Sequence, residues 1–501
     1  MKKKYDLFKA IMICFIIYIA LSWIIPTGTL SEGAVTAAKI APVGLFGIFN
    51  YPLITIATFI QFGVVALAIG AFYGVLDKTG VYKKFVENFA KKYENKERLF
   101  LIAFIVITMI LSSVIGVNYA FFVFVPLFMG VLLKMGYNKI TALSATIGSI
   151  LAGSIASTYG LGNATQISNI LGLKNGDNIW LKFAFLVIVI ALYVFFVVGN
   201  KESKLMPKTK KTTKKIKETI EETKKTTKKV VKPKTETIIE DIVIDAPFME
   251  NQEVSSKKQK PLGIMLVLLT VILFLSMINW KYMFKVEIFE VLFKLMQDVK
   301  VFEIPIITSV LGVSNPFGYW TSYEMSALLL IMGAVIGWIY NLKFDQIIEG
   351  FINGGKKMFK TAFLMTIGCV VFTLMLSGSG SNMFVTITDK LLKLTEGFNF
   401  FTTSVVSLLS GFFYNDFYYA LNSVSSLFTK GYDAEFLPII GFIFQSMHSI
   451  VMMLVPTSLI LIGGLSILGV SIKEWIKYIF KFALQLIALT LVISVVLVLL
   501  V

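Results

Sequence analysis

The amino-acid sequence predicts an all-α polytopic membrane protein with two inverted repeats. Of its 501 residues 56% are hydrophobic, and the mean hydropathy of +0.79 lies outside the range of soluble proteins. Apolar segments long enough to cross a bilayer recur along the chain, and in each half one of them is interrupted by residues that disfavour a helix. We therefore expect each repeat to contain a helical hairpin and a broken transmembrane helix, with a basic cytoplasmic linker joining the repeats.

The polar composition argues against most catalytic and metal-binding classes. The chain has two cysteines, Cys14 and Cys369, both in apolar segments, and one histidine, His448. Neither a disulfide framework nor a histidine metal site is expected, and no Ser/His/Asp set or pair of acids indicates an enzyme. We interpret the net charge of +17 as a topology signal beside membrane spans rather than as a nucleic-acid site. No cofactor is expected.

The N-terminal repeat is expected over residues 1–200 and starts in the cytoplasm, because Lys2–Lys4 precede the first apolar segment. The linker, 201–260, has 17 lysines against 10 acidic residues and no apolar periodicity. This composition predicts a disordered cytoplasmic spacer, with attraction to anionic lipid headgroups as the alternative. The C-terminal repeat, 261–501, begins with an additional helix. The expected membrane segments are 7–25, 51–76, 99–117, 119–134, 141–171, 179–199, 262–281, 324–342, 359–376, 398–413, 414–428, 437–463 and 482–501, about thirteen crossings, which re-entrant hairpins would lower.

The two halves share a faint internal similarity. The run 69–80 aligns with 367–380, and the Gly-Tyr pair at 136–137 aligns with that at 431–432. This register places the interruption at 160–165 opposite the one at 455–458. The loop 77–98 carries seven Lys and Arg residues against four acids, whereas 377–397 has no positive excess. The positive-inside rule puts these loops on opposite sides of the membrane, so the repeats are predicted to be inverted.

The paired interruptions are the candidate substrate or ion site. Backbone groups freed inside a membrane must be satisfied by protein, ion or water, so broken helices often mark binding sites. Carbonyl, hydroxyl and amide oxygens suit Na⁺, and helix-end N–H groups suit a carboxylate. The alternatives are helix packing through small residues for the first cluster and a proline kink for the second. The two clusters are Ser157, Thr158, Gly160, Gly162, Asn163 and Thr165, and Pro456, Thr457 and Ser458.

Four further polar residues lie in apolar surroundings. Asn415 and Asp416 interrupt an aromatic segment, and a mid-membrane acid is a functional candidate by default; the alternative is an interfacial position among tyrosines. Asp416 is a candidate ligand for an amino group or a coupling proton, and the repeat register places Asn118 opposite it. His448 is expected to be either a packed, hydrogen-bonded side chain or a proton-coupling group.

At 69–80, IGAFYGVLDKTG, the chain resembles the YfcC-type carriers, relatives of the anaerobic C4-dicarboxylate carriers in the ion transporter superfamily. Two weaker matches are Phe444-Gln445 followed by Pro456-Thr457-Ser458, and Ser157-Thr158 at the first break. The resemblance implies a secondary carrier with inverted repeats, an elevator-like movement, and transport of amino acids, including arginine/ornithine exchange, or carboxylates. The chain departs from the family pattern at 115–121, which lacks its acidic pair, at Gly160-Leu161, which replaces Asn-Pro, and at 446–449, which replaces Gly-Asp-Gly.

We therefore expect a multi-pass transporter of the cytoplasmic membrane, a symporter or exchanger working by alternating access with Na⁺ or H⁺ as candidate coupling ions. An amino acid is the first candidate substrate and a mono- or dicarboxylate the second. A non-transporting scaffold with a degenerate carrier fold is the alternative from another class. Expected partners are the substrate and membrane lipid, but not nucleic acid; a homodimer is left open.

Overall fold

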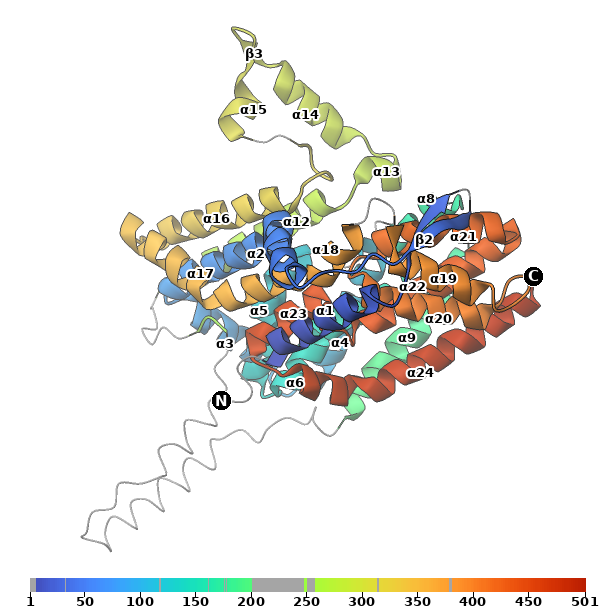
Figure 1. Ribbon diagram of the computed structural model, residues 1–501. Helices are drawn as coiled ribbons and strands as arrows, with labels where there is room; N and C mark the ends of the chain where they lie inside the picture. The colour runs from blue at the N-terminus through green and yellow to red at the C-terminus, as the bar shows by residue number, and fades with distance from the viewer. Residues whose placement is uncertain are drawn as a thin grey trace, which may run out of the picture.

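The computed structural model describes residues 6–31, 33–116, 119–160, 162–174, 176, 178–200, 247–249, 257–312, 315–377 and 381–501. These residues form one helical body, from which a short arm containing α13, α14 and α15 projects (Figure 1). Within the described ranges, seven helices are long and apolar enough to cross a membrane. The chain is thus a mostly helical, multi-pass membrane protein, as the hydropathy predicts.

The N-terminal half begins with α1 (Asp6–Ser22) and a β-hairpin. A hairpin of α4 and α5 follows the long helix α2 and the amphipathic helix α3, and the next membrane helix is broken. The bounds are β1 Thr27–Ser31, β2 Ala34–Lys39, α2 Gly47–Lys78, α3 Tyr82–Lys92, α4 Glu97–Ile115, α5 Tyr119–Met135, α6 Lys139–Leu143, the π-helix η1 Ser144–Gly148, α7 Ser149–Ile155, α8 Asn163–Leu171 and α9 Ile179–Gly199.

The C-terminal half has the additional helix α12 and the projecting arm, and then repeats the order of hairpin, broken helix and long helix. The bounds are α12 Lys260–Met277, α13 Trp280–Phe284, α14 Ile288–Asp298, β3 Lys300–Val301, β4 Ile304–Pro305, α15 Ile306–Leu311, α16 Ser322–Ile339, α17 Phe344–Ile367, α18 Val370–Leu376, β5 Ser381–Asn382, α19 Met383–Leu392, α20 Phe400–Phe413, α21 Phe417–Gly431, η3 Ala434–Phe436, α22 Leu437–Met452, α23 Leu459–Leu468 and α24 Ile472–Leu499. Only small parts of the predicted linker, 247–249 and 257–260, are described.

Helices α2 and α17 make the most extensive contact between elements. Their backbones touch through glycines: a Cβ added to Gly354 would lie within 2.8 Å of the Gly74 Cα, and one added to Gly74 would lie 2.7 Å from the Gly354 Cα. At one end of the pair Lys78 bonds to Glu349 at 2.9 Å, and Lys357 lies 3.8 Å from Asp77. Close approach through small residues is how helices associate without a hydrophobic driving force. The pair is closely packed, and α16 packs against α2 on the same wall of the bundle.

The hairpins and broken helices pack reciprocally. Helix α8, the second part of the first broken helix, contacts α21, the second hairpin helix of the other half. Helix α23 occupies the equivalent place in the second broken helix and contacts α5. Helices α7 and α22 contact each other, and each also contacts the first hairpin helix of its own half. The two broken helices therefore meet in the interior.

Several predicted boundaries were wrong. Helix α17 begins at Phe344, not near 359, because its charged first half is paired with α2 rather than left in water. Helix α24 begins at Ile472, ten residues before the predicted span. Besides the seven span-length helices, the described residues include five shorter apolar helices, so the number of membrane crossings stays a prediction. The stretch between the first two predicted membrane segments contains a β-hairpin that pairs, through β1, with β5.

Candidate functional site

The first break lies where the sequence predicts it. Helix α7 ends at Ile155 and α8 begins at Asn163. Gly160 between them has φ +99°, a conformation that disfavours other residues, and a Cβ there would collide with the Val114 carbonyl oxygen. Thr165 closes the turn by donating its hydroxyl to the Gly160 carbonyl. The chain thus turns sharply against the tip of the α4–α5 hairpin.

Ser113, near the end of α4, holds this turn. Its hydroxyl donates to the Ala156 carbonyl at 2.8 Å, which leaves the Thr158 hydroxyl, 3.0 Å away, as the donor to Ser113 Oγ. The Ser113 carbonyl accepts from the Ser157 hydroxyl at 3.1 Å and from the Thr158 N–H at 3.3 Å. All three side chains are buried. The Ser-Thr pair singled out in the sequence is therefore a structural tie to the hairpin as well as a candidate ligand.

Helix α22 supplies the other partners of the first break. The Gln445 amide nitrogen donates to the carbonyls of Ile155 at 3.2 Å and Ser157 at 3.0 Å. Both partners are acceptors, so this atom must be the nitrogen. Among the described residues, the buried Gln445 Oε1 atom then has no hydrogen-bond partner. The Ser446 hydroxyl also donates to Ile155 O, at 3.3 Å.

Asn163, the first residue of α8, reaches across to the same helix. Its amide donates to the Ser449 hydroxyl at 3.1 Å, and Ser449 donates to the Ser154 carbonyl at 3.4 Å. These bonds connect the N-terminus of α8 to the last turn of α22 and hence join the two halves.

The second break lies between Met452, the end of α22, and Leu459, the start of α23. It contains the predicted Pro456, Thr457 and Ser458. The Trp475 indole donates to the Met453 carbonyl at 2.8 Å. The Asn415 amide, at the tip of the α20–α21 hairpin, lies 3.5 Å from both Thr457 O and Cys369 Sγ. Like the first, this break is tied to the hairpin tip of its own half.

The structure gives Asp416 and His448 local roles. Asp416 is the N-cap of α21 and accepts from the Tyr419 N–H at 3.1 Å, so it lies at the hairpin tip. His448 Nδ1 lies 2.8 Å from Ser410 Oγ, and its ring packs against Phe417 and Phe444. That environment matches a packed, hydrogen-bonded histidine. Asn118 and Leu161 lie outside the described residues.

Of the candidate residues, the structure brings the first cluster into contact with α22 and places Asn415 and Asp416 beside the second cluster. The role of Ser113 in holding the first break was not predicted from sequence. Gln445, Ser446 and Ser449 were noted only for their resemblance to a family pattern. Their spacing on one face of a mainly apolar helix is the sequence feature that could have indicated their contact with the break.

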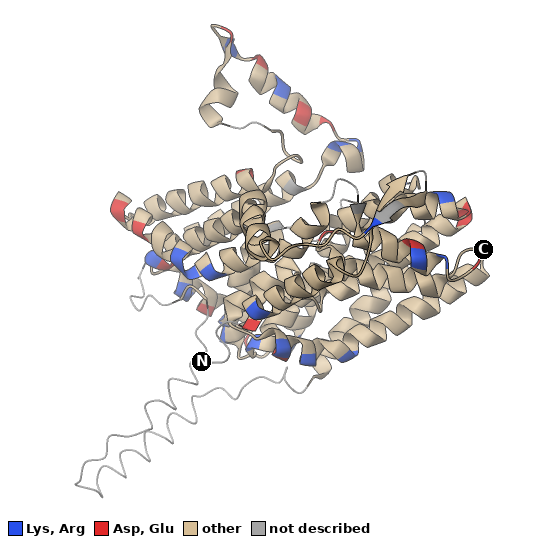
Figure 2. Ribbon diagram, in the orientation of Figure 1, with Lys and Arg blue, Asp and Glu red and all other residues tan. Residues whose placement is uncertain are grey.

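Every group named at the two breaks is uncharged except Asp416. Figure 2 shows Lys and Arg gathered mainly at one end of the bundle, around α3 and the beginning of α24, while the interior ribbons are tan. Hydroxyls, amides and helix termini are therefore the groups that a small ligand would meet. Within the described residues, no cluster of three His, Cys, Asp or Glu side chains could hold a metal ion.

This fold and site define a polytopic helical membrane protein whose buried polar groups gather where two transmembrane helices are interrupted. The model of the C4-dicarboxylate anaerobic carrier family matches residues 5–415, and the chain belongs to that family. It is therefore a membrane transporter rather than an enzyme.

Two solved structures are similar over nearly the full length. The YdaH transporter of Alcanivorax borkumensis is 16% identical, with 97% of each chain covered and a TM-score of 0.37. MtrF of Neisseria gonorrhoeae, described with a class of antimetabolite efflux pumps, is 14% identical, with 96% of this chain and 94% of MtrF covered and a TM-score of 0.36. No curated protein matches the chain.

Proposed function

We propose that this transporter carries a small carboxylate-bearing metabolite across the cytoplasmic membrane by alternating access, with the N-terminus in the cytoplasm. The observation that supports this most directly is the pair of interrupted helices, joined by the Asn163–Ser449 bond at 3.1 Å. Each interruption places the N-terminus of a second helix, α8 or α23, inside the bundle, and at α8 the Ala164 N–H donates to Ser157 Oγ at 3.3 Å. A helix N-terminus carries about half a positive charge, which favours a carboxylate where no Lys or Arg side chain is needed.

The reciprocal packing supports a division into two bodies that come from inverted repeats. In this proposal the hairpins and broken helices of both halves, α4–α8 and α20–α23, carry the substrate. The glycine-packed α2–α17 pair with α16 stays fixed. The lysines at one end of the bundle mark the cytoplasmic side. Movement of the first body past the second would present the same site to either side, as in an elevator.

We expect the coupling ion to bind beside the substrate, at the first break. The buried Gln445 Oε1 has no hydrogen-bond partner within the part of the chain that the structure describes, and an unsatisfied buried acceptor costs on the order of 1–3 kcal/mol. Na⁺ or a substrate N–H group would satisfy it. Exchange of one substrate for another is the alternative to ion coupling.

Both candidate classes of substrate carry a carboxylate group. The name of the family favours a C4-dicarboxylate. An amino acid is the second candidate, because Asp416 at the hairpin tip and Gln445 Oε1 are acceptors for an ammonium group.

Uptake into proteoliposomes tests the proposal. Vesicles preloaded with succinate, or with arginine, alanine or ornithine, are supplied with the labelled compound under a Na⁺ gradient, a pH gradient or neither. Counterflow of succinate alone indicates a dicarboxylate carrier, and counterflow of amino acids alone indicates the second candidate. If neither class moves under any gradient or preload, the proposal is wrong.

A matched pair of variants tests the site. Asn163→Ala removes the amide that donates to Ser449 at 3.1 Å, and Asn88→Ala removes a surface amide that donates to Gln259, also at 3.1 Å. Loss of one hydrogen bond at the site is expected to slow uptake about tenfold, whereas Asn88→Ala should leave it unchanged. Equal losses in both variants would contradict the location of the site.

A further inference from the structure

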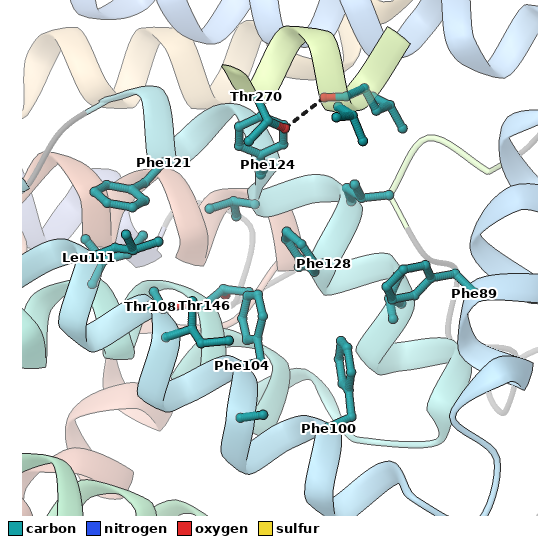
Figure 3. A pocket seen from close by; sticks show the side chains of 18 of the residues that line it. Phe89, Phe100, Phe104, Thr108, Leu111, Phe121, Phe124, Phe128, Thr146 and Thr270 are labelled. Carbon is teal, nitrogen blue, oxygen red and sulfur yellow. Dashed lines mark hydrogen bonds between the residues drawn. The ribbon is translucent and has the colours of Figure 1, made fainter. Parts of the chain in front are cut away.

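A large cavity lies apart from the two breaks, between the α4–α5 hairpin and α12. It has a volume of about 800 Å³ and reaches from Lys96, at the start of α4, to Ile115, at its end. Figure 3 shows side chains of α4 and α5, together with Thr270 of α12, lining this space. The volume lies within the range of ligand-binding pockets, about 300–1,000 Å³. None of the candidate substrate-binding residues that the structure describes lines it.

The wall of the cavity is a row of aromatic rings. Phe89 of α3 lies 5.9 Å from Phe100 of α4, measured between ring centroids. Phe100 lies 6.1 Å from Phe104, and Phe104 lies 4.5 Å from Phe128 of α5. Phe121 and Phe124 continue the lining farther along the hairpin (Figure 3). This surface is suited to a long hydrocarbon chain.

Two of the three threonines that line the cavity are already hydrogen-bonded within their own helices. The Thr270 hydroxyl donates to the Leu266 carbonyl at 2.8 Å, and the Thr146 hydroxyl donates to Ala142 O at 2.7 Å. Each hydroxyl is therefore engaged by its own helix, and the cavity is lined mainly by carbon.

One side of the cavity opens sideways, along the length of the helices. Leu99, Ile107 and Val267 line it and are 64%, 56% and 64% exposed. In a multi-pass protein, such apolar side chains on the outer surface of membrane helices face lipid. The opening therefore admits molecules from the bilayer rather than from water.

The end of the cavity at Lys96 carries positive charge. Lys91, Lys92, Lys96 and Arg98 are exposed there, at the end of α3 and the start of α4. The two acids in the same stretch, Glu94 and Glu97, leave a positive excess, and Glu97 is buried. A basic site at the membrane surface beside an apolar cavity is complementary to a lipid with a negative headgroup and long chains.

We propose that this cavity binds an anionic phospholipid, with an acyl chain between the α4–α5 hairpin and α12 and the phosphate near Lys96. An occupant reaching Ile115 lies next to the hairpin tip that Ser113 ties to the first break. The lipid therefore sets the distance between the hairpin and α12, and its occupancy is expected to influence transport.

The test counts lipids bound to the full-length purified chain by native mass spectrometry after titration with phosphatidylglycerol or phosphatidylcholine of identical acyl chains. The wild-type chain is expected to prefer phosphatidylglycerol. Lys96→Gln should reduce that preference about fivefold, the effect of one lysine at a membrane surface. Lys139→Gln, an exposed lysine outside the cavity lining, is the matched control and should not change it.

Two variants fill the cavity from opposite walls. Ala103→Trp places a bulky ring from α4, and Gly263→Leu adds a side chain from α12, where a new Cβ would lie 3.5 Å from Phe85, an ordinary contact. Both should reduce binding of either phospholipid at least tenfold. Ile110→Trp, an exposed position of α4 outside the lining, should not, and the melting temperature of each variant shows whether it is folded.

Equal binding of the two phospholipids, or unchanged binding in both filled variants, would overturn the proposal. If a helix of a second copy of the chain occupies the cavity instead, the filled variants should become monomeric while the number of bound lipids stays the same. That result would also refute the lipid proposal. The readout is binding, so its failure is independent of any failure to observe transport.

Discussion

The α2–α17 interface offers a sharp test of the architecture, because two adjacent glycines of one helix have opposite environments. A Cβ added to Gly354 would collide with the Gly70 carbonyl and would lie 2.7 Å from its carbon, whereas a Cβ added to Gly355 would meet nothing within 4 Å. The atoms that Gly354→Ala would strike belong to backbone, so they yield only if the helices separate. Overpacking of this kind costs about 1–3 kcal/mol.

Gly355, the next residue of the same helix, provides the matched control for Gly354→Ala. Either alanine gains up to about 1 kcal/mol of helix propensity, and this gain cancels in the difference between Gly354→Ala and Gly355→Ala. We therefore expect Gly354→Ala to be less stable than Gly355→Ala by about 1–3 kcal/mol, which lowers its melting temperature in detergent by a few degrees. Equal melting temperatures would refute the close contact of α2 with α17.

Two further predictions concern the candidate site. Ser113→Ala removes the hydroxyl that bonds to Ala156 O and Thr158, and should destabilise the chain by about 1–2 kcal/mol and slow uptake; normal uptake would show that the hairpin tie is dispensable. His448→Gln should lower the melting temperature but leave the pH dependence of uptake unchanged, because the ring is enclosed by Phe417, Phe444 and Ser410. A pH profile that flattens in this variant would instead support proton coupling through His448.

The positions of both breaks could be predicted from sequence because they depend on local chemistry. Clusters of glycine, proline and polar residues disfavour a continuous helix, and the structure interrupts the two helices at such clusters. What surrounds each break could not be predicted, because Gln445 lies 288 residues from Ser157 in the chain. Only the fold brings them together.

The predicted helix boundaries were wrong where charged residues pair with a distant helix instead of facing water. Lys357 and Glu349 suggest a loop in the sequence, but in α17 they face Asp77 and Lys78 of α2. The pairing of β1 with β5 was not predicted for a similar reason. Thr27–Ser31 is a short strand, and the strand beside it in the sheet, Ser381–Asn382, comes from the other half of the chain. Neither the start of α17 nor the β1–β5 pairing can be predicted from the residues of one segment alone.

The glycine contact between α2 and α17 also has a consequence for biosynthesis. Gly354 follows Gly74 by about 280 residues, which a ribosome adds in roughly 15–55 seconds at 5–20 residues per second. During that interval α2 has entered the membrane without the helix that covers its glycines. The N-terminal half must wait, exposed to lipid or to the insertion machinery, for a partner that is synthesised much later. Interventions that slow translation between the halves therefore lengthen the period in which the chain is vulnerable to degradation.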